Sequence, residues 1–321
     1  MLLQFLLIFV GVALVLWGAD CMTEGAASLA RKLRVPEIVI GLTIVAAGTS
    51  APELFVSVVS ALNGTPDLAV GNVVGSNTMN AMIIVGVSAM VAPMVISRST
   101  VRCDIPFAVV SSVLLMVLCL DEMCSWSISG NAISRIDGIL LLAGFAVFMT
   151  FALRQARHGQ SNEQQEDTDS QQMPVWRGLA YVALGLLCLV VGSNLFVDAA
   201  TKLAQQLGVS EGVIGLTIVA GGTSLPELAT SVVAARKGQS AIAIGNVIGS
   251  NVFNILLILG LTAVISPMQI EGITLVDLSV MLVSVSLVWL FSATKLTVAR
   301  WEGAVLTGGY LVYLAWLISQ L

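Results

Sequence analysis

The chain has 321 residues, of which 57% are hydrophobic and only 10% are charged, with 14 Lys and Arg residues against 19 Asp and Glu. A soluble domain carries about 25% charged residues, so the composition excludes an ordinary water-soluble enzyme and a disordered chain. It also argues against nucleic acid as a partner, because no basic patch is present to neutralise phosphates. The composition instead predicts an all-α, polytopic membrane protein whose surroundings are the lipid bilayer.

Ten apolar stretches are long enough to cross a hydrocarbon layer about 30 Å thick, which takes about 20 helical residues. They lie at residues 2–19, 36–62, 68–92, 105–120, 136–153, 176–197, 210–235, 241–266, 274–293 and 302–319. No Lys or Arg precedes the first stretch, so we expect a permanent transmembrane helix there and not a cleaved signal.

The positions of the Lys and Arg residues predict the orientation of these spans. If the N-terminus faces outside, twelve of the basic residues fall inside and only Arg135 and Lys202 fall outside. Both termini are therefore expected outside, and the polar segment 154–175 is expected to be a cytoplasmic linker. This linker separates a first unit of five spans, residues 1–153, from a second unit of five, residues 176–321.

The two units contain the same sequence pattern. Residues 41–86 and 215–260 are identical at 27 of 46 positions, at a constant offset of 174 residues and without a gap. Because five is an odd number of spans, the second unit enters the membrane from the opposite side. The sequence thus predicts two inverted five-helix repeats, an architecture typical of secondary transporters, whose substrate sites lie near the bilayer midplane between the repeats.

Each copy of the pattern places one carboxylate at bilayer depth. Glu53 ends the sequence Gly-Thr-Ser-Ala-Pro-Glu in the second span, and Glu227 ends Gly-Thr-Ser-Leu-Pro-Glu in the seventh. A carboxylate at this depth indicates a functional site by default. The alternative is helix capping, because Ser50 and Ser224 begin the S-x-x-E pattern of a capping box. We expect the capping geometry to be present together with a functional site.

Prolines accompany both carboxylates and predict that the second and seventh helices are broken. Pro52 lacks a backbone donor and tends to end the helix before it. Thr49 and Ser50 are then expected in an unwound stretch, where the carbonyls of Ala46 and Ala47 lose their helical partners and become cation ligands. Non-helical backbone at this depth is tolerated only where it lines a site or a cavity.

Further polar residues follow in the third and eighth spans. Asn72, Ser76 and Asn80 are spaced four apart and so share one helix face, and the second copy repeats them as Asn246, Ser250 and Asn254. Joining of helices by hydrogen bonds is the expected role of Asn72, Asn77, Asn246 and Asn251. The assembled donors are all oxygens, which select hard cations such as Ca²⁺, Na⁺, Mg²⁺ or Mn²⁺. Two carboxylates just neutralise one divalent ion.

The paired motifs G-T-S-x-P-E and G-N-x-x-G-S-N-x-x-N resemble the two α-repeats of the cation/calcium exchangers, in particular the bacterial sodium/calcium exchangers of the YrbG-like kind. The resemblance implies an antiporter of the bacterial inner membrane that exchanges Ca²⁺ for Na⁺ by alternating access and needs no cofactor. It implies that Glu53 and Glu227 are the central Ca²⁺ ligands. The other implied ligands of Ca²⁺ and Na⁺ are Thr49, Ser50, Ser76, Thr223, Ser224, Ser250 and the carbonyls of Ala46 and Ala220. Some members carry an aspartate where this chain has the candidate ligand Asn80 or Asn254, so a third site charge is absent here.

Other functions remain open on the sequence. Among transporters, exchange of Ca²⁺ for protons or K⁺-dependent Na⁺/Ca²⁺ exchange is the alternative. A cation channel is the alternative from another class, although one two-fold site lacks the ring symmetry of common filters. An intramembrane hydrolase is disfavoured because no His or Lys base lies near the serines, so no enzyme is expected.

Overall fold

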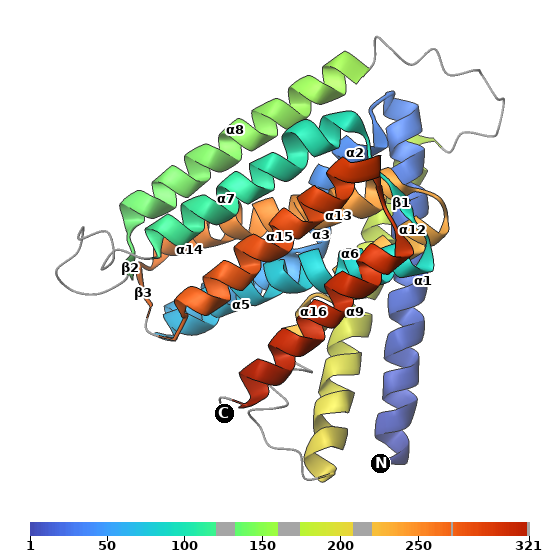
Figure 1. Cartoon of the computed structure of the whole chain (residues 1–321). Coiled ribbons are helices and arrows are strands. Elements are labelled where there is room, and N and C mark those ends of the chain that lie inside the picture. Colours follow the sequence, from blue (N-terminus) through green and yellow to red (C-terminus); the bar gives the residue numbers. More distant parts are fainter. Residues whose placement is uncertain (120–131, 160–173, 208–219, 271, 320–321) are drawn as a thin grey trace.

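The structure is a computed structural model that describes residues 1–119, 132–159, 174–207, 220–270 and 272–319 (Figure 1). The first half contains the helices α1 (Leu2–Leu33), α2 (Glu37–Ile40), α3 (Ala46–Thr49), α4 (Ala51–Leu62), α5 (Pro66–Met79), α6 (Val85–Val91), α7 (Ile105–Leu118) and α8 (Arg135–Gly159), the π-helical turns η1 (Gly41–Val45), η2 (Asn80–Ile84) and η3 (Thr100–Asp104), and the strands β1 (Met94–Val95) and β2 (Ala132–Ile133). The second half contains the helices α9 (Val175–Gln206), α11 (Ala220–Thr223), α12 (Leu225–Arg236), α13 (Ser240–Val252), α14 (Gly260–Ile265), α15 (Leu275–Lys295) and α16 (Arg300–Ser319), the π-helical turn η5 (Phe253–Leu259), and the strands β3 (Met268–Gln269) and β4 (Thr297–Val298).

The described helices confirm a polytopic, all-α membrane protein. Eight of them are long and apolar enough to cross a bilayer, and the bent pair Glu37–Thr49 and Ala51–Leu62 gives a ninth candidate span. These nine coincide with predicted spans. The remaining predicted span, 210–235, is described only from residue 220 onward, and most of the predicted linker, residues 160–173, also lies outside the described residues.

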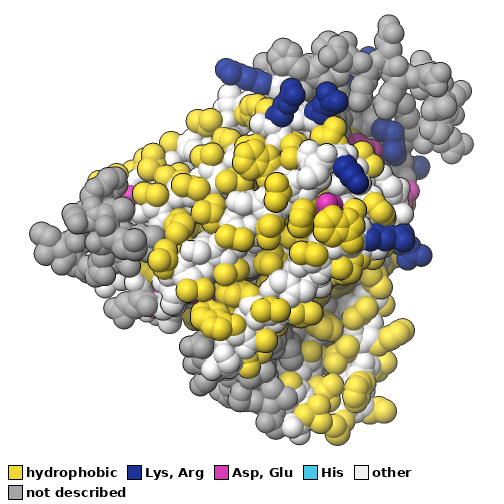
Figure 2. All heavy atoms as spheres, viewed as in Figure 1, with side chains coloured by type: hydrophobic (Ala, Val, Ile, Leu, Met, Phe, Trp, Pro, Cys, Tyr) yellow, Lys and Arg dark blue, Asp and Glu magenta, His cyan; other side chains and the backbone are white. Residues whose placement is uncertain are grey.

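Two central helical rods form the interior. One consists of α5, η2 and α6, and the other of α13, η5 and α14. In the most apolar 18-residue stretch of each rod, 72% and 78% of the residues are buried. The helices α7, α8, α15 and α16 lie around them (Figure 1). Their outer surfaces are broadly hydrophobic, and the Lys and Arg side chains gather toward one end of the molecule (Figure 2). An apolar belt beside a basic end is typical of a membrane protein.

The two halves are also joined at their edges by two short antiparallel ladders. Strand β1 pairs with β4, with Met94 opposite Val298, and β2 pairs with β3, with Ile133 opposite Met268. Each ladder therefore contains one strand from each half.

The first helix of each half is much longer than its apolar stretch predicts. We expected spans at 2–19 and 176–197, but α1 and α9 each have 32 residues. They lie side by side (Figure 1) because glycines recur every seven residues along both. A Cβ added to Gly18 would lie 2.8 Å from the backbone oxygen of Gly185, and one added to Gly11 or Gly25 would meet Gly192 or Gly178 as closely. The backbones thus touch directly, as small-residue motifs permit in membranes.

Candidate cation site

The helices that carry the two carboxylates are broken at equivalent residues. Ser50 separates α3 from α4 with φ −82° and ψ 7°, and Ser224 separates α11 from α12 with φ −90° and ψ 7°. The two parts of the first broken helix differ in direction by 46°. The predicted break of the second and seventh helices is therefore confirmed at both serines.

The break is shorter than we expected, and the prediction of freed carbonyls at Ala46 is wrong. Thr49 still belongs to α3, so only Ser50 interrupts the helix. The Ala46 carbonyl accepts a hydrogen bond from the Ser50 N–H at 3.0 Å and another from the Thr49 hydroxyl at 3.4 Å. Pro52 acts elsewhere: its missing N–H is the one that would bind the carbonyl of Gly48, four residues earlier.

The serine of each copy binds the glutamate of the other copy. Ser50 Oγ donates to Glu227 Oε1 at 3.1 Å, and Ser224 Oγ donates to Glu53 Oε1 at 3.3 Å. The expected capping boxes are therefore wrong, because neither serine side chain caps its own helix. Helix capping therefore does not account for the positions of Glu53 and Glu227, whose carboxylates accept hydrogen bonds from serines of the opposite half.

The candidate ligands are buried at this junction. Glu53 and Glu227 are each only 1% exposed. The other buried candidates are Thr49, Ser50, Ser76, Asn80, Ser224, Ser250 and Asn254. Thr49 donates to Asn246 Oδ1 at 3.0 Å, and Thr223 lies beside the Glu53 carboxyl group. Ala220 begins α11, at the start of the second broken helix.

Five buried oxygens of this set have no hydrogen-bond partner. They are Glu53 Oε2, Glu227 Oε2, Asn80 Oδ1, Asn254 Oδ1 and Ser250 Oγ. Buried polar atoms in native proteins are almost always satisfied, and exceptions mark functional groups or bound ions. The four carboxyl and amide oxygens can only accept hydrogen bonds, and the same oxygens are suitable ligands for a hard cation.

A second set of hydrogen bonds holds the helices that carry the carboxylates. The Asn72 amide donates to the Glu53 carbonyl at 3.3 Å and to Ser57 Oγ at 3.1 Å. Asn246 repeats this in the other copy, where it donates to the Glu227 carbonyl at 3.3 Å and to Ser231 Oγ at 2.9 Å. The predicted role of Asn72 and Asn246 in joining helices is confirmed. The sequence analysis missed both serines, although each is identical in the two copies at the offset of 174 residues.

Asparagines also connect the two central rods. Asn77 donates to the Asn251 carbonyl at 3.2 Å, while the Asn80 amide donates to Asn251 Oδ1 and the Asn254 amide to Asn77 Oδ1, both at 3.0 Å. These bonds use the amide nitrogens of Asn80 and Asn254, whose side-chain oxygens have no partner. The turns η2 and η5 start at or just before these two residues, and π-helical turns are frequent at functional sites.

The two copies differ at the serines of the central rods. Ser76 Oγ lies 3.4 Å from Ser224 Oγ, whereas its counterpart Ser250 Oγ has no partner. The site is therefore pseudo-symmetric and not strictly symmetric.

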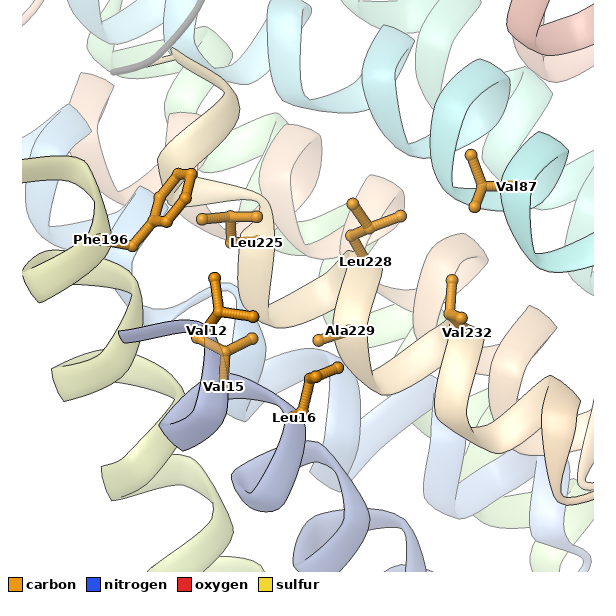
Figure 3. Close-up of a pocket in the computed structure, with 9 residues that line it drawn as sticks. All are labelled: Val12, Val15, Leu16, Val87, Phe196, Leu225, Leu228, Ala229 and Val232. Carbon is orange, nitrogen blue, oxygen red and sulfur yellow. The ribbon is translucent and has the colours of Figure 1, made fainter. Parts of the chain in front are cut away.

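An apolar cavity of about 280 Å³ lies beside the second carboxylate helix (Figure 3). Leu225 and Leu228 of α12, which flank Glu227 in the sequence, line one side. Leu16 of α1 and Phe196 of α9 line the other. The cavity thus lies among α1, α6, α9 and the helix that carries Glu227, where α1 and α9 also contact α12 directly.

This fold and this set of donors define a polytopic membrane protein with a candidate hard-cation site where its two halves meet. Among known protein families, the model of the sodium/calcium exchanger protein family matches residues 3–154 and 177–319. The chain belongs to the sodium/calcium exchanger protein family.

Individual relatives agree along the whole chain. The inner membrane protein YrbG of Escherichia coli K12 is 38% identical over 325 residues, which cover 99% of this chain and 97% of the relative. The sodium/calcium exchanger MaX1 of Methanosarcina acetivorans is 33% identical, and the alignment covers 97% of each chain. Solved structures of the sodium–calcium exchanger NCX_Mj, soaked with Na⁺ and either Ca²⁺ or Sr²⁺, superpose with a TM-score of 0.83 at 29–30% identity and cover 98% of each chain.

Proposed function

We propose that this protein is a secondary antiporter that exchanges Ca²⁺ for Na⁺ across the cytoplasmic membrane of a bacterium. The observation that carries the proposal is the set of five unpartnered, buried oxygens, two of which belong to carboxylates from different halves. Two carboxylates balance the charge of one divalent ion, and the same hard oxygens suit Na⁺. The family and the names of MaX1 and NCX_Mj support the same pair of ions.

The proposed ligands follow from the geometry of the site. Glu53 and Glu227 are proposed to bind Ca²⁺ directly, through the oxygens that accept no hydrogen bond. The remaining proposed ligands of Ca²⁺ and Na⁺ are Thr49, Ser50, Ser76, Asn80, Thr223, Ser224, Ser250, Asn254 and the carbonyls of Ala46 and Ala220. The Ala46 carbonyl already accepts two hydrogen bonds, so we propose a weaker role for it than for the carboxylates.

The proposed architecture is ten spans in two inverted repeats, 1–153 and 176–321, with both termini outside and the linker 154–175 in the cytoplasm. The duplicated motifs and the matching hydrogen bonds of the two copies support the repeats. The distribution of Lys and Arg supports the orientation. In this arrangement, alternating access exposes the central site to each side of the membrane in turn.

Uptake of radiolabelled Ca²⁺ into proteoliposomes tests the proposal. An outward Na⁺ gradient should drive uptake, and a matched outward K⁺ gradient should not. Uptake driven by a pH gradient without Na⁺ would instead support exchange for protons. Uptake that needs both Na⁺ and K⁺ would support the K⁺-dependent exchange, and single-channel currents would support a channel.

A further inference from the structure

The α1–α9 pair packs unequally on the two halves of the molecule. Helix α1 packs along α12, which carries Glu227. The counterparts of these helices in the repeat are α9 and α4. Among the described residues, α9 contacts α3, α11 and α12 but does not pack along α4. In this structure the pair is therefore closed against α12 and not against α4, and alternating access, as proposed above, would exchange the two arrangements.

One ion pair connects α1 to the turn that follows α12. Lys237 Nζ lies 2.6 Å from Asp20 Oδ1 and also donates to the backbone carbonyl of Asp20 at 3.3 Å. Asp20 lies on α1, and Lys237 lies in the turn between α12 and α13. No other ion pair joins two residues in the described part of the chain.

The repeat does not reproduce this ion pair on the other half. At the offset of 174 residues, the counterpart of Asp20 is Asn194 on α9 and the counterpart of Lys237 is Asn63 after α4. Two neutral amides cannot form an ion pair. When the opposite conformation closes α9 against α4, the equivalent position therefore lacks this charge attraction.

We propose that Asp20 and Lys237 form a one-sided electrostatic latch that biases the protein toward the conformation closed at α12. The proposal rests on alternating access, as proposed above, and adds a preferred resting direction to it. The two side chains are 51% and 30% exposed, so the latch is weak and reversible. Exposed ion pairs change an equilibrium by about 1.4- to 5-fold, which permits turnover while favouring one side.

The latch is tested by measuring the distance between α4 and α9 in reconstituted protein. Spin labels at Phe55 and Leu187, which are both exposed, report whether α9 lies apart from α4 or against it. In a cysteine-free background, Asp20→Asn and, independently, Lys237→Gln should raise the fraction of short distances about 1.4- to 5-fold. Glu24→Gln is the matched control, because it removes the same charge one turn further along α1 and should leave the distances unchanged.

Two further variants separate a latch from a loss of structure. The double variant Asp20→Lys with Lys237→Asp restores an ion pair of opposite polarity and should return the distances to those of the unsubstituted protein. Asn194→Asp with Asn63→Lys transplants the pair to the other half and should favour short distances even with the original pair intact. Distances in the single variants equal to those of Glu24→Gln, or a charge swap without rescue, would overturn the latch. If the latch is overturned but Na⁺-driven Ca²⁺ uptake persists, the proposed function stands without the latch. If the label distances shift as expected but the protein shows no Na⁺-driven Ca²⁺ uptake, the proposed function is overturned and the latch is not.

Discussion

Replacing either central carboxylate by its amide tests the candidate site directly. Glu53→Gln keeps the size and one oxygen of the side chain but removes one of the two negative charges. The unpartnered Glu53 Oε2, or the oxygen bound to Ser224, becomes an NH₂ group. A donor is thereby placed among oxygens that can only accept.

The expected loss is large because the side chain is only 1% exposed. Removing one partner of a buried charge pair costs about 3–5 kcal/mol, which corresponds to a loss of Ca²⁺ affinity of roughly 150- to 4,000-fold. Na⁺ carries half the charge and should lose less. Glu227→Gln should behave in the same way, since its carboxylate has the same burial and the same kind of serine partner.

The assay is equilibrium binding of radiolabelled Ca²⁺ to purified protein, followed by uptake into proteoliposomes. Glu53→Asp should be intermediate, because the charge remains and the ligand is withdrawn by one methylene. Glu24→Gln again controls for the loss of a charge away from the site. A folded and inserted Glu53→Gln protein with near-normal Ca²⁺ affinity and flux would refute the reasoning, and the cation site would then lie elsewhere.

The remaining predictions concern the supports of the site and the arrangement in the membrane. Asn246→Leu removes the amide that holds the Glu227 helix and should lower stability by about 1–3 kcal/mol; unchanged thermal unfolding and Ca²⁺ affinity would contradict this role. Gly18→Val should lower stability by about 1–3 kcal/mol through overpacking against α9, whereas Gly308→Val, whose added Cβ meets no described neighbour within 4 Å, should not; equal melting temperatures would contradict the packing. Shortening the tract 160–171 should leave Ca²⁺ uptake intact, because it has no apolar surface to pack. Cysteines placed in that tract should be labelled only from the cytoplasmic side, and labelling from outside would reverse the proposed orientation.

The sequence predicted which polar residues lie deep in the protein better than it predicted their bonding. Repetition of the same polar residues drew attention to Glu53 and Glu227, which the structure buries at the junction of the two halves. The capping prediction failed because a spacing of three residues describes only a local partner. The actual partner of Ser50 is Glu227, 177 residues away, and that contact depends on how the two copies meet.

The backbone details failed for a related reason. A proline predicts that one hydrogen bond is missing, but it does not fix how far the helix unwinds. At Ser50 the chain resumes its helix after a single residue, and the carbonyls of Ala46 and Ser50 both keep helical hydrogen bonds. The π-helical turns that begin at Asn80 and Phe253 could not be predicted either. In a buried stretch the hydrophobic pattern does not show that one turn contains one residue more than an α-helical turn.

The direct backbone contact between α1 and α9 has a consequence for how the protein is made. During synthesis, α1 enters the membrane long before α9 has been translated, because 141 residues lie between Leu33 and Val175. Until then its glycine face lacks the partner helix that it contacts in the folded protein. Since the carboxylates are also bonded to serines of the opposite half, a first half released alone would have an incomplete site and an exposed glycine face. The first half therefore completes neither this helix contact nor its site until the second half has been made.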